Sequence, residues 1–187
     1  NTLFYVGEIM NFQEYPFQRL NKLLEDVKKN DLYEEASLTI GEPQFDTPKF
    51  IQDEITSKIH FLNKYPKSLG EDFLRESQIE FVSKRFDVQL SMKQIFPTFG
   101  TREVLFNFPQ FLLDSKTTPT MAFTNPFYQI YDGSALASHA QKIYINLTKE
   151  NNFCARLSDD ELKQCDLVII NYPNNPTSSV AGLDELV

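Results

Sequence analysis

Asp166-Leu-Val-Ile-Ile-Asn171 is the stretch that decides the fold class. Its four consecutive apolar residues, three of them β-branched, fit a strand that is buried on both faces better than an amphipathic strand. A strand of this kind belongs in the middle of a parallel sheet that helices cover on both sides. The stretch therefore predicts an α/β protein in which strand 166–171 is central.

The sequence before this strand alternates between helical and extended patterns. Such alternation predicts a three-layer α/β/α domain with a mostly parallel central sheet, preceded here by an N-terminal helical segment. That segment begins at Pro16, ends near 29–30, and is followed by an extended piece at 36–40. The other expected elements are helices at 48–60, 71–85, 102–113, 127–138 and 158–164, and strands at 93–98, 119–124, 141–146 and 166–171. Pro109 predicts a kink or an early end in the helix at 102–113.

Composition and charge exclude several classes of protein. The net charge of −8 argues against nucleic-acid binding, which depends on clustered Lys and Arg, so a small molecule is the expected partner. No run of eighteen apolar residues suggests a membrane span, and the first residues lack the layout of a signal peptide, so we expect a cytoplasmic protein. Cys154 and Cys165 have no histidine nearby, and we expect free thiols rather than a metal site or a disulfide.

The loop Phe99-Gly-Thr-Arg-Glu103 follows an expected strand and opens a helix. Ligands of open α/β sheets bind at the carboxyl ends of the strands. Gly100 allows the backbone to approach a ligand closely, the N–H groups at the helix start favour a phosphate, and Thr101 adds a hydroxyl. A single glycine before a helix is equally typical of a plain turn, and the loop has neither a Walker pattern nor a dinucleotide fingerprint.

Two more loops follow expected strands. Asn125-Pro-Phe-Tyr-Gln-Ile-Tyr131 carries three aromatic residues, of which Phe127 and Tyr131 have the spacing of core residues, while Tyr128 is placed to stack on a planar ring. Asn171-Tyr-Pro-Asn-Asn-Pro-Thr177 contains Asn175, whose amide can both donate and accept hydrogen bonds. The bond between Asn175 and Pro176 is a candidate for cis geometry. By local pattern alone, the last loop is a turn.

Five blocks of the sequence together resemble the class I/II aminotransferases of fold type I, which use pyridoxal 5'-phosphate (PLP). The blocks are Leu38-Thr-Ile-Gly-Glu-Pro-Gln-Phe-Asp-Thr-Pro48, Lys64-Tyr-Pro-Lys-Ser-Leu-Gly70, Gly100-Thr-Arg-Glu-Val-Leu-Phe106, Asn125-Pro-Phe-Tyr-Gln-Ile-Tyr131 and Pro173-Asn-Asn-Pro-Thr177. They occur in the family's order, and the resemblance runs from about Phe12 to the end. Within the family, the third and fourth blocks are most similar to the succinyldiaminopimelate aminotransferases.

This resemblance implies a role for each matching residue. Gly100, Thr101 and Arg102 match the turn whose main-chain N–H groups hold the cofactor phosphate. Tyr128 matches the aromatic residue that stacks on the pyridine ring. Asn175 matches the amide that bonds both the cofactor's ring oxygen and the substrate's α-carboxylate.

Two residues nearer the start of the chain also match. Gly41 matches a main-chain contact to the substrate's α-carboxylate. Tyr65 matches a tyrosine that reaches the cofactor phosphate of the partner subunit, which implies a homodimer; without the resemblance, Tyr65 would be interpreted as a surface aromatic. Ser178 departs from the glycine that many relatives have after the threonine.

The resemblance also implies a reaction. We expect amino transfer from glutamate to a keto acid, N-succinyl-2-amino-6-oxopimelate, with aspartate or aromatic transamination as the alternative. A non-catalytic PLP-binding or dimerisation module, including the ligand-sensing domain of a transcription regulator, is a further alternative. The family's Schiff-base lysine, pyridine-nitrogen aspartate and carboxylate-binding arginine would lie beyond Val187, so the chain alone is expected to be inactive.

The expected division of the chain has three parts. Residues 1–9 have no pattern that matches the rest and are expected to be a non-native leader. Residues 10–45 are expected to be the N-terminal segment of the small domain, and residues 46–187 the first part of the large, PLP-binding domain.

Overall fold

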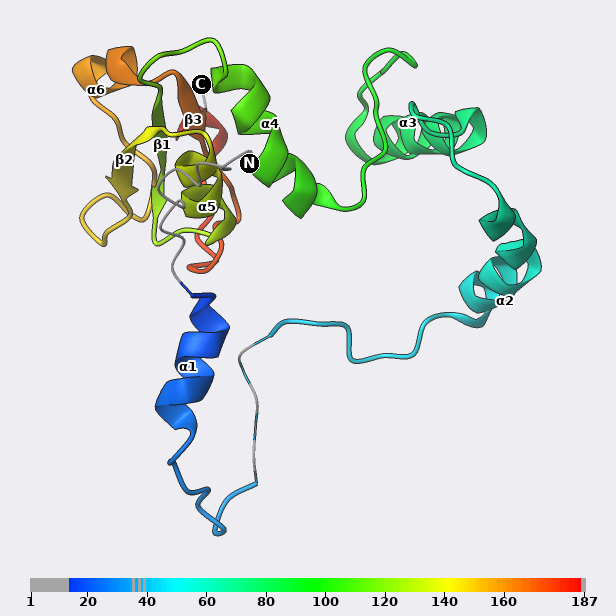
Figure 1. Cartoon of the computed structure of the whole chain (residues 1–187), viewed down its shortest axis with the longest axis horizontal. Coiled ribbons are helices and arrows are strands. Elements are labelled where there is room, and N and C mark those ends of the chain that lie inside the picture. The colour runs from blue at the N-terminus through cyan, green and yellow to red at the C-terminus, as the bar shows by residue number, and fades with distance from the viewer. Residues whose placement is uncertain (1–13, 35, 37, 39, 186–187) are drawn as a thin grey trace, which may run out of the picture. The chain divides into compact units, whose positions relative to one another are not determined.

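The computed structural model describes residues 14–34, 36, 38 and 40–185 (Figure 1). They form two compact units, residues 15–97 and residues 98–185 with Glu14. The expected leader at 1–9 lies outside the described residues. The expected domain boundary between 45 and 46 stays a prediction.

A three-stranded parallel sheet is the centre of the 98–185 unit, in the order β2-β1-β3 (Figure 1). Strand β1 (Thr120–Asn125) pairs with β2 (Gln141–Asn146), with Thr120 opposite Gln141. On its other side β1 pairs with β3 (Leu167–Ile169), with Met121 opposite Leu167. The parallel sheet expected from the alternating pattern is confirmed.

Within the described residues the central strand is β1, and the expectation that strand 166–171 is central and buried on both faces is not met there. Every residue of β3 is half-buried, and Ile170 after it is 50% exposed. Met121, Ala122 and Phe123 of β1, in contrast, are completely buried. Among the described residues, β3 has a strand neighbour on one side only, whereas β1 has one on each side. A run of apolar residues indicates a strand, but it does not fix the position of that strand in the sheet.

Helices α4 (Thr101–Leu113) and α5 (Ile130–Ala137) pack together beside the sheet (Figure 1). The hydroxyl of Ser134 in α5 donates to the carbonyl of Phe106 in α4 at 2.9 Å. Helix α4 continues through the buried Pro109 to Leu113, so of the two alternatives expected at Pro109 the early end is wrong and the kink stays a prediction. Helix α5 begins later than expected, because Pro126 to Gln129 form the turn that leaves β1.

Helix α6 (Asp159–Gln164) begins with a capping box, and η2 (Leu183–Glu185) closes the described chain. The Oγ of Ser158 accepts from the N–H of Glu161 at 3.3 Å, and the N–H of Ser158 donates to the Glu161 carboxylate at 2.8 Å. These bonds satisfy N–H groups that the helix start leaves without a partner. The backbone bond from Ser158 also lowers the pKa of Glu161. The helix expected at 158–164 is thereby confirmed.

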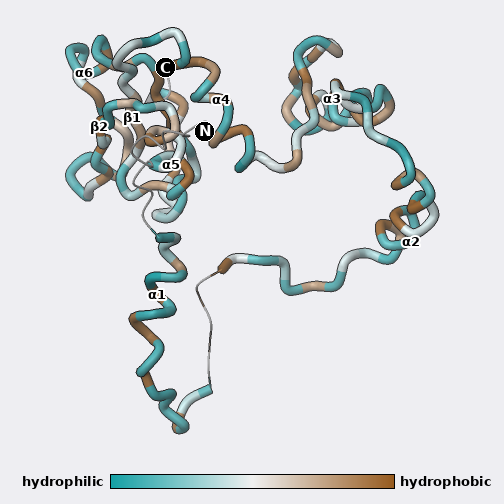
Figure 2. Tube along the Cα trace, in the orientation of Figure 1, coloured by the Kyte–Doolittle hydropathy of each residue, from teal (hydrophilic) through white to brown (hydrophobic). Residues whose placement is uncertain are grey.

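The 15–97 unit consists of α1 (Pro16–Leu24), α2 (Lys49–Lys58), η1 (Ile59–Asn63) and α3 (Asp72–Phe86). Helix α1 ends earlier than the expected 29–30. The extended piece expected at 36–40 lies partly outside the described residues. No residue of these three α-helices is buried, although apolar residues occur along them, as the brown stretches of the trace at α2 show in Figure 2.

The strand expected at 93–98 is wrong, because these residues form turns and irregular backbone. Pro97 has no N–H to contribute to a strand ladder. It lies instead against Gly70, where an added Cβ would come within 2.2 Å of the Pro97 Cγ. Gly70 has a φ of +80°, so both the backbone conformation and the close approach require glycine there.

Cys154 is a buried thiol, and Cys165 is a half-buried one. Among the described helices, none combines the length and the apolar character that crossing a membrane requires.

Candidate functional site

The start of helix α4 has the geometry of an anion-binding turn. Gly100 is the N-cap residue, with φ +97° and ψ 151°, a conformation that is essentially restricted to glycine. A Cβ added at Gly100 would meet nothing within 4 Å, so the backbone faces open space. Gly100 has no side chain to cap the helix, and the main-chain N–H groups of the first turn, with the positive end of the helix dipole, favour an anion there.

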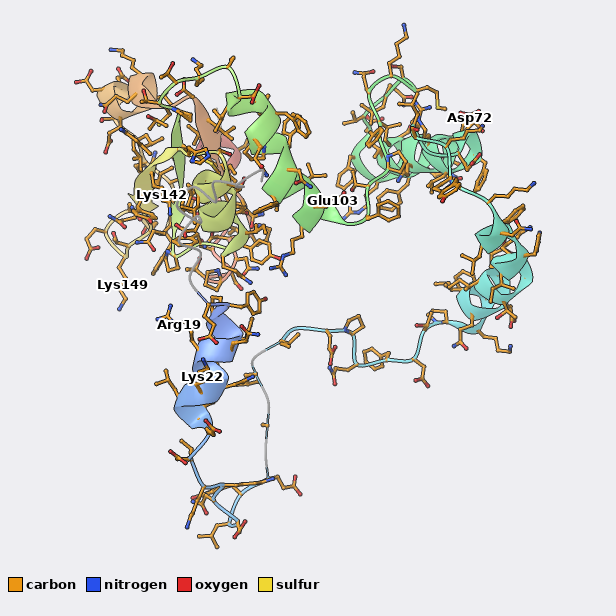
Figure 3. The ribbon with its side chains drawn as sticks, in the orientation of Figure 1. Arg19, Lys22, Asp72, Glu103, Lys142 and Lys149 are labelled. Carbon is orange, nitrogen blue, oxygen red and sulfur yellow. The ribbon has the colours of Figure 1, made fainter. Side chains whose placement is uncertain are left out.

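Glu103 lies in the first turn of the same helix (Figure 3) and was not singled out from the sequence. Its carboxylate accepts a hydrogen bond from the N–H of Phe99 at 3.2 Å. A carboxylate at this position also interacts favourably with the helix dipole. An anion bound at Gly100 would therefore share the helix start with one negative charge, which favours contacts through N–H groups other than that of Phe99.

Tyr128 is the half-buried aromatic residue of the loop that leaves β1. Its ring lies edge-to-face on the ring of Tyr131, with centroids 6.0 Å apart and an interplanar angle of 87°. The guanidinium carbon of Arg102 lies 5.9 Å from the centroid of the Tyr128 ring, within the range of a cation–π contact. These two contacts hold the plane of the Tyr128 ring, and the second joins the loop at Gly100 to the loop after β1.

Phe127 and Tyr131 are core residues, as expected. Tyr131 is 3% exposed, and burial, with a smaller effect of Tyr128, raises the pKa of its phenol. Phe127 packs edge-to-face on Phe123 at 5.0 Å and is stacked on Tyr144 at 5.9 Å. Both residues are thus occupied by the protein itself, which leaves Tyr128 as the aromatic residue of this loop that is available to a ligand.

Asn175 is exposed, and the peptide bond to Pro176 is cis, as the sequence suggested. Its neighbour Asn174, which the sequence did not single out, is 2% exposed. The hydroxyl of Thr124, at the end of β1, donates to the Oδ1 of Asn174 at 3.1 Å. This bond joins the loop after β3 to the loop after β1. Nothing in the residue types distinguishes the two asparagines, so only the structure could separate them.

Ser178 has a φ of +57°, the left-handed conformation that glycine adopts most easily. The backbone conformation at this position therefore suits the glycine that the family resemblance implies there. The Ser178 N–H donates to the carbonyl of Asn174 at 2.7 Å and closes the turn around Asn175. The substitution therefore keeps the turn that presents Asn175.

The structure brings three of the predicted loops together at the carboxyl edge of β1, through the Arg102–Tyr128 contact and the Thr124–Asn174 bond. Gly41 and Tyr65 belong to the other unit and are exposed, Tyr65 completely. Their place in a common site stays a prediction. Within the described part of the chain, no group of three or more His, Cys, Asp or Glu residues is arranged to hold a metal ion.

The comparison with protein families decides the assignment. The model of aminotransferase class I and II matches residues 34–187. The chain belongs to this family. The family uses PLP, and the turn at Gly100, the ring of Tyr128 and the exposed amide of Asn175 fit a group with a phosphate, a planar ring and a ring oxygen.

Named relatives agree with the family. The chain is 32% identical over 182 residues to the LL-diaminopimelate aminotransferase of Dehalococcoides mccartyi, covering 94% of this chain and 46% of that protein. It is 29% identical over 168 residues to the aspartate aminotransferase of Pyrococcus horikoshii, covering 84% of this chain and 42% of that protein. The chain spans about half the length of the curated relatives it matches. Neither relative carries the name succinyldiaminopimelate aminotransferase, and that finer assignment stays a proposal.

Solved structures confirm the fold. The aminotransferase AspB from Helicobacter pylori is similar with a TM-score of 0.89 at 48% identity, covering 94% of this chain and 46% of that one. An aminotransferase from Neisseria meningitidis is similar with a TM-score of 0.82 at 34% identity and the same coverage. The described part of the chain therefore has the α/β fold of fold type I aminotransferases, as the sequence predicted, over part of the domain.

Proposed function

We propose that the protein carrying these residues is a PLP-dependent aminotransferase, which moves an amino group from an amino acid to a keto acid. One observation carries the proposal: a glycine-capped helix start, a held tyrosine ring and an exposed amide lie on loops that contact one another at the edge of β1. PLP supplies an electron sink for the charge that develops at the α-carbon of the amino acid. The residues of this chain bind and orient the reacting groups.

The main-chain N–H groups of Gly100, Thr101 and Arg102 hold the phosphate in this proposal. A phosphate at a helix start is stabilised by up to about 2 kcal/mol in a partly buried site. Tyr128 stacks on the pyridine ring, and its contacts with Tyr131 and Arg102 keep its own plane fixed. A fixed ring would limit the tilt of the cofactor and therefore the direction from which the amino group of the substrate approaches it.

Asn175 orients both cofactor and substrate. Its amide N–H groups can donate to the ring oxygen and to the α-carboxylate. Gly41 adds a main-chain contact to the same carboxylate. Tyr65, whose side chain is completely exposed, reaches the cofactor phosphate of a second copy of the chain in a homodimer. These roles follow from the family resemblance and the exposure of the residues.

For the substrates, we propose glutamate as the donor and a keto acid with the diaminopimelate skeleton as the acceptor. The sequence blocks at Gly100–Phe106 and Asn125–Tyr131 favour N-succinyl-2-amino-6-oxopimelate, and a relative named LL-diaminopimelate aminotransferase supports the same skeleton. Aspartate is the second candidate, supported by the Pyrococcus relative. Aromatic amino acids are the remaining alternative.

The first experiment titrates PLP into the protein that carries these residues and follows the cofactor's absorbance. We expect Tyr128→Ala and Asn175→Ala each to weaken PLP binding about tenfold, because each removes a contact of about 1–2 kcal/mol. Tyr33→Ala is the matched control, since Tyr33 is a 73% exposed tyrosine of the other unit. Equal effects of the three substitutions would contradict the proposed site.

The second experiment tests the reaction and its substrates. The same protein is given glutamate, aspartate or an aromatic amino acid with N-succinyl-2-amino-6-oxopimelate as acceptor, and kcat/KM is compared for each donor and for alternative acceptors. We expect the highest value for glutamate with the succinylated acceptor. PLP binding without any transamination would instead identify a non-catalytic PLP-binding module.

A further inference from the structure

Two adjacent asparagines in the loop after β3 have opposite surroundings. Asn175 is exposed, whereas Asn174 is 2% exposed and is one of the few buried polar residues of the described chain. A buried amide without partners would destabilise the fold, so its hydrogen bonds show what it holds in place.

The side-chain amide of Asn174 uses its acceptor and its donors. Its Oδ1 accepts from the Thr124 hydroxyl at 3.1 Å, and its Nδ2 donates to the Thr177 Oγ1 at 2.9 Å and to the Pro126 carbonyl at 3.4 Å. An amide is the side-chain group that offers an acceptor and two N–H donors at one end. An aspartate of the same shape would lose both donors and place a charge in a buried position.

The main chain of Asn174 is held as firmly as its side chain. Its N–H donates to the carbonyl of Ser179 at 2.8 Å, and its carbonyl accepts from Ser178 at 2.7 Å. The turn 174–179 is thereby closed on itself. Because Asn175 lies inside this closed turn, the position of its backbone is fixed relative to Asn174.

The two partners on the other loop flank the chain that leads to Tyr128. Thr124 is a completely buried residue of β1, and Pro126 lies two residues before Tyr128. One buried amide therefore contacts the base of the loop that carries Tyr128 and belongs to the turn that carries Asn175. A movement of Asn174 would change the positions of both.

We propose that Asn174 is a positioning residue, which sets the placement of Asn175 relative to Tyr128 through its hydrogen bonds to Thr124 and Pro126. This inference rests on the proposed function, in which Tyr128 and Asn175 contact PLP. Asn174 itself contacts neither cofactor nor substrate. It acts by fixing the distance and the angle between two groups that do.

The test uses Thr124→Val, which is nearly isosteric and removes one hydrogen bond to Asn174, together with Asn174→Asp. Ser134→Ala is the matched control, because Ser134 is also completely buried and its hydroxyl also makes one hydrogen bond, between α5 and α4. Hydrogen exchange of the peptides 125–129 and 171–179 is measured in the cofactor-free protein. The induced circular dichroism of bound PLP and the KM of the amino donor are measured in the loaded protein.

We expect Thr124→Val and Asn174→Asp to speed exchange in both peptides, to change the induced circular dichroism, and to raise the KM about three- to tenfold, the effect of one hydrogen bond. Ser134→Ala is expected to lower thermal stability only. If Asn174→Asp does not fold, Thr124→Val alone decides. Wild-type protein that binds no PLP overturns both the proposed function and this inference. If the wild-type protein binds PLP but Thr124→Val has the same effects as Ser134→Ala on exchange, circular dichroism and KM, the inference alone is overturned.

Discussion

The two units of the chain differ in where their apolar residues lie. In the 98–185 unit, residues such as Met121 and Phe123 of β1 and Tyr131 of α5 form a buried core between the helix and the sheet. Between residues 15 and 97, no described residue is buried, and Leu23 and Phe81 are 78% and 62% exposed. In the part of the chain that the structure describes, the helices of the 15–97 unit therefore lack a second layer that would bury their apolar side chains. Within the described residues, the hydrophobic contribution to stability lies in the 98–185 unit.

The largest effect is expected when one phenyl ring is removed from each unit and the free energies of unfolding are compared. Phe123→Ala removes a completely buried ring that contacts Phe127, Tyr131 and Tyr144, and we expect it to lower the free energy of unfolding by about 3–5 kcal/mol. Phe81→Ala, in helix α3, is expected to change it by less than about 1 kcal/mol. Because the chain has no tryptophan, urea unfolding is followed by far-ultraviolet circular dichroism. Similar losses for the two variants would remove the contrast between the units.

A smaller effect is expected from the tight contact between Gly70 and Pro97 in the 15–97 unit. Gly70→Ala places a Cβ on Pro97 and strains a left-handed backbone, and we expect a loss of about 1–3 kcal/mol. Gly100→Ala in the other unit has the backbone strain without the clash, and a smaller loss is expected. Hydrogen exchange of peptides around residues 70 and 97 measures the effect locally. If hydrogen exchange of these peptides is unchanged in Gly70→Ala, the contact between Gly70 and Pro97 does not restrict the backbone of the 15–97 unit.

The smallest effect concerns pH. The Lys116 ammonium, 2.7 Å away, and the Thr120 N–H, 2.9 Å away, hold the pKa of Asp166 below its usual value. A lowered folded-state pKa stabilises the fold fully above the unfolded-state value of about 3.9, and this stabilisation is lost as the pH falls through the folded-state pKa. We expect Asp166→Asn to make the free energy of unfolding depend less on pH in the acid range.

Glu80 in helix α3 provides the control for that measurement. Its hydrogen bond with Lys84 also lowers its pKa, but its side chain is 63% exposed, so water screens the pair. Glu80→Gln is therefore expected to leave this pH dependence nearly unchanged. An equal reduction of the pH dependence by both substitutions would show that the position of the carboxylate in the sheet unit has no special effect.

The sequence predicted the elements of the sheet unit better than their arrangement. Strand 141–146 was predicted with the observed bounds, because its pattern and its flanking turns are local signals. The order β2-β1-β3 could not be predicted, since β3 has the more apolar sequence and β1 has the central place. The prediction of a strand at 93–98 was wrong for a similar reason. Pro97 contacts Gly70, which is far from it in the sequence, and a local pattern does not indicate such a contact.

The candidate site shows the same limit at the level of single residues. Gly100 and Tyr128 stood out because a glycine before a helix and an aromatic residue after a strand are local patterns. The contact of Arg102 with Tyr128 and the burial of Asn174 are tertiary features, and no local pattern indicates them. The roles of the site residues stay predictions that the experiments above can decide.

The central place of β1 has a consequence for how the chain folds during synthesis. Both strands that cover its edges come later in the sequence, and the N–H of Thr120 bonds to Asp166, 46 residues further on. At about 5–20 residues per second, a ribosome needs roughly 2–9 seconds to make that stretch. Until then, one edge of the most deeply buried strand of the unit is open to pairing with other chains. The rate at which the segment from β2 to β3 leaves the ribosome therefore controls how long the nascent chain is exposed to aggregation.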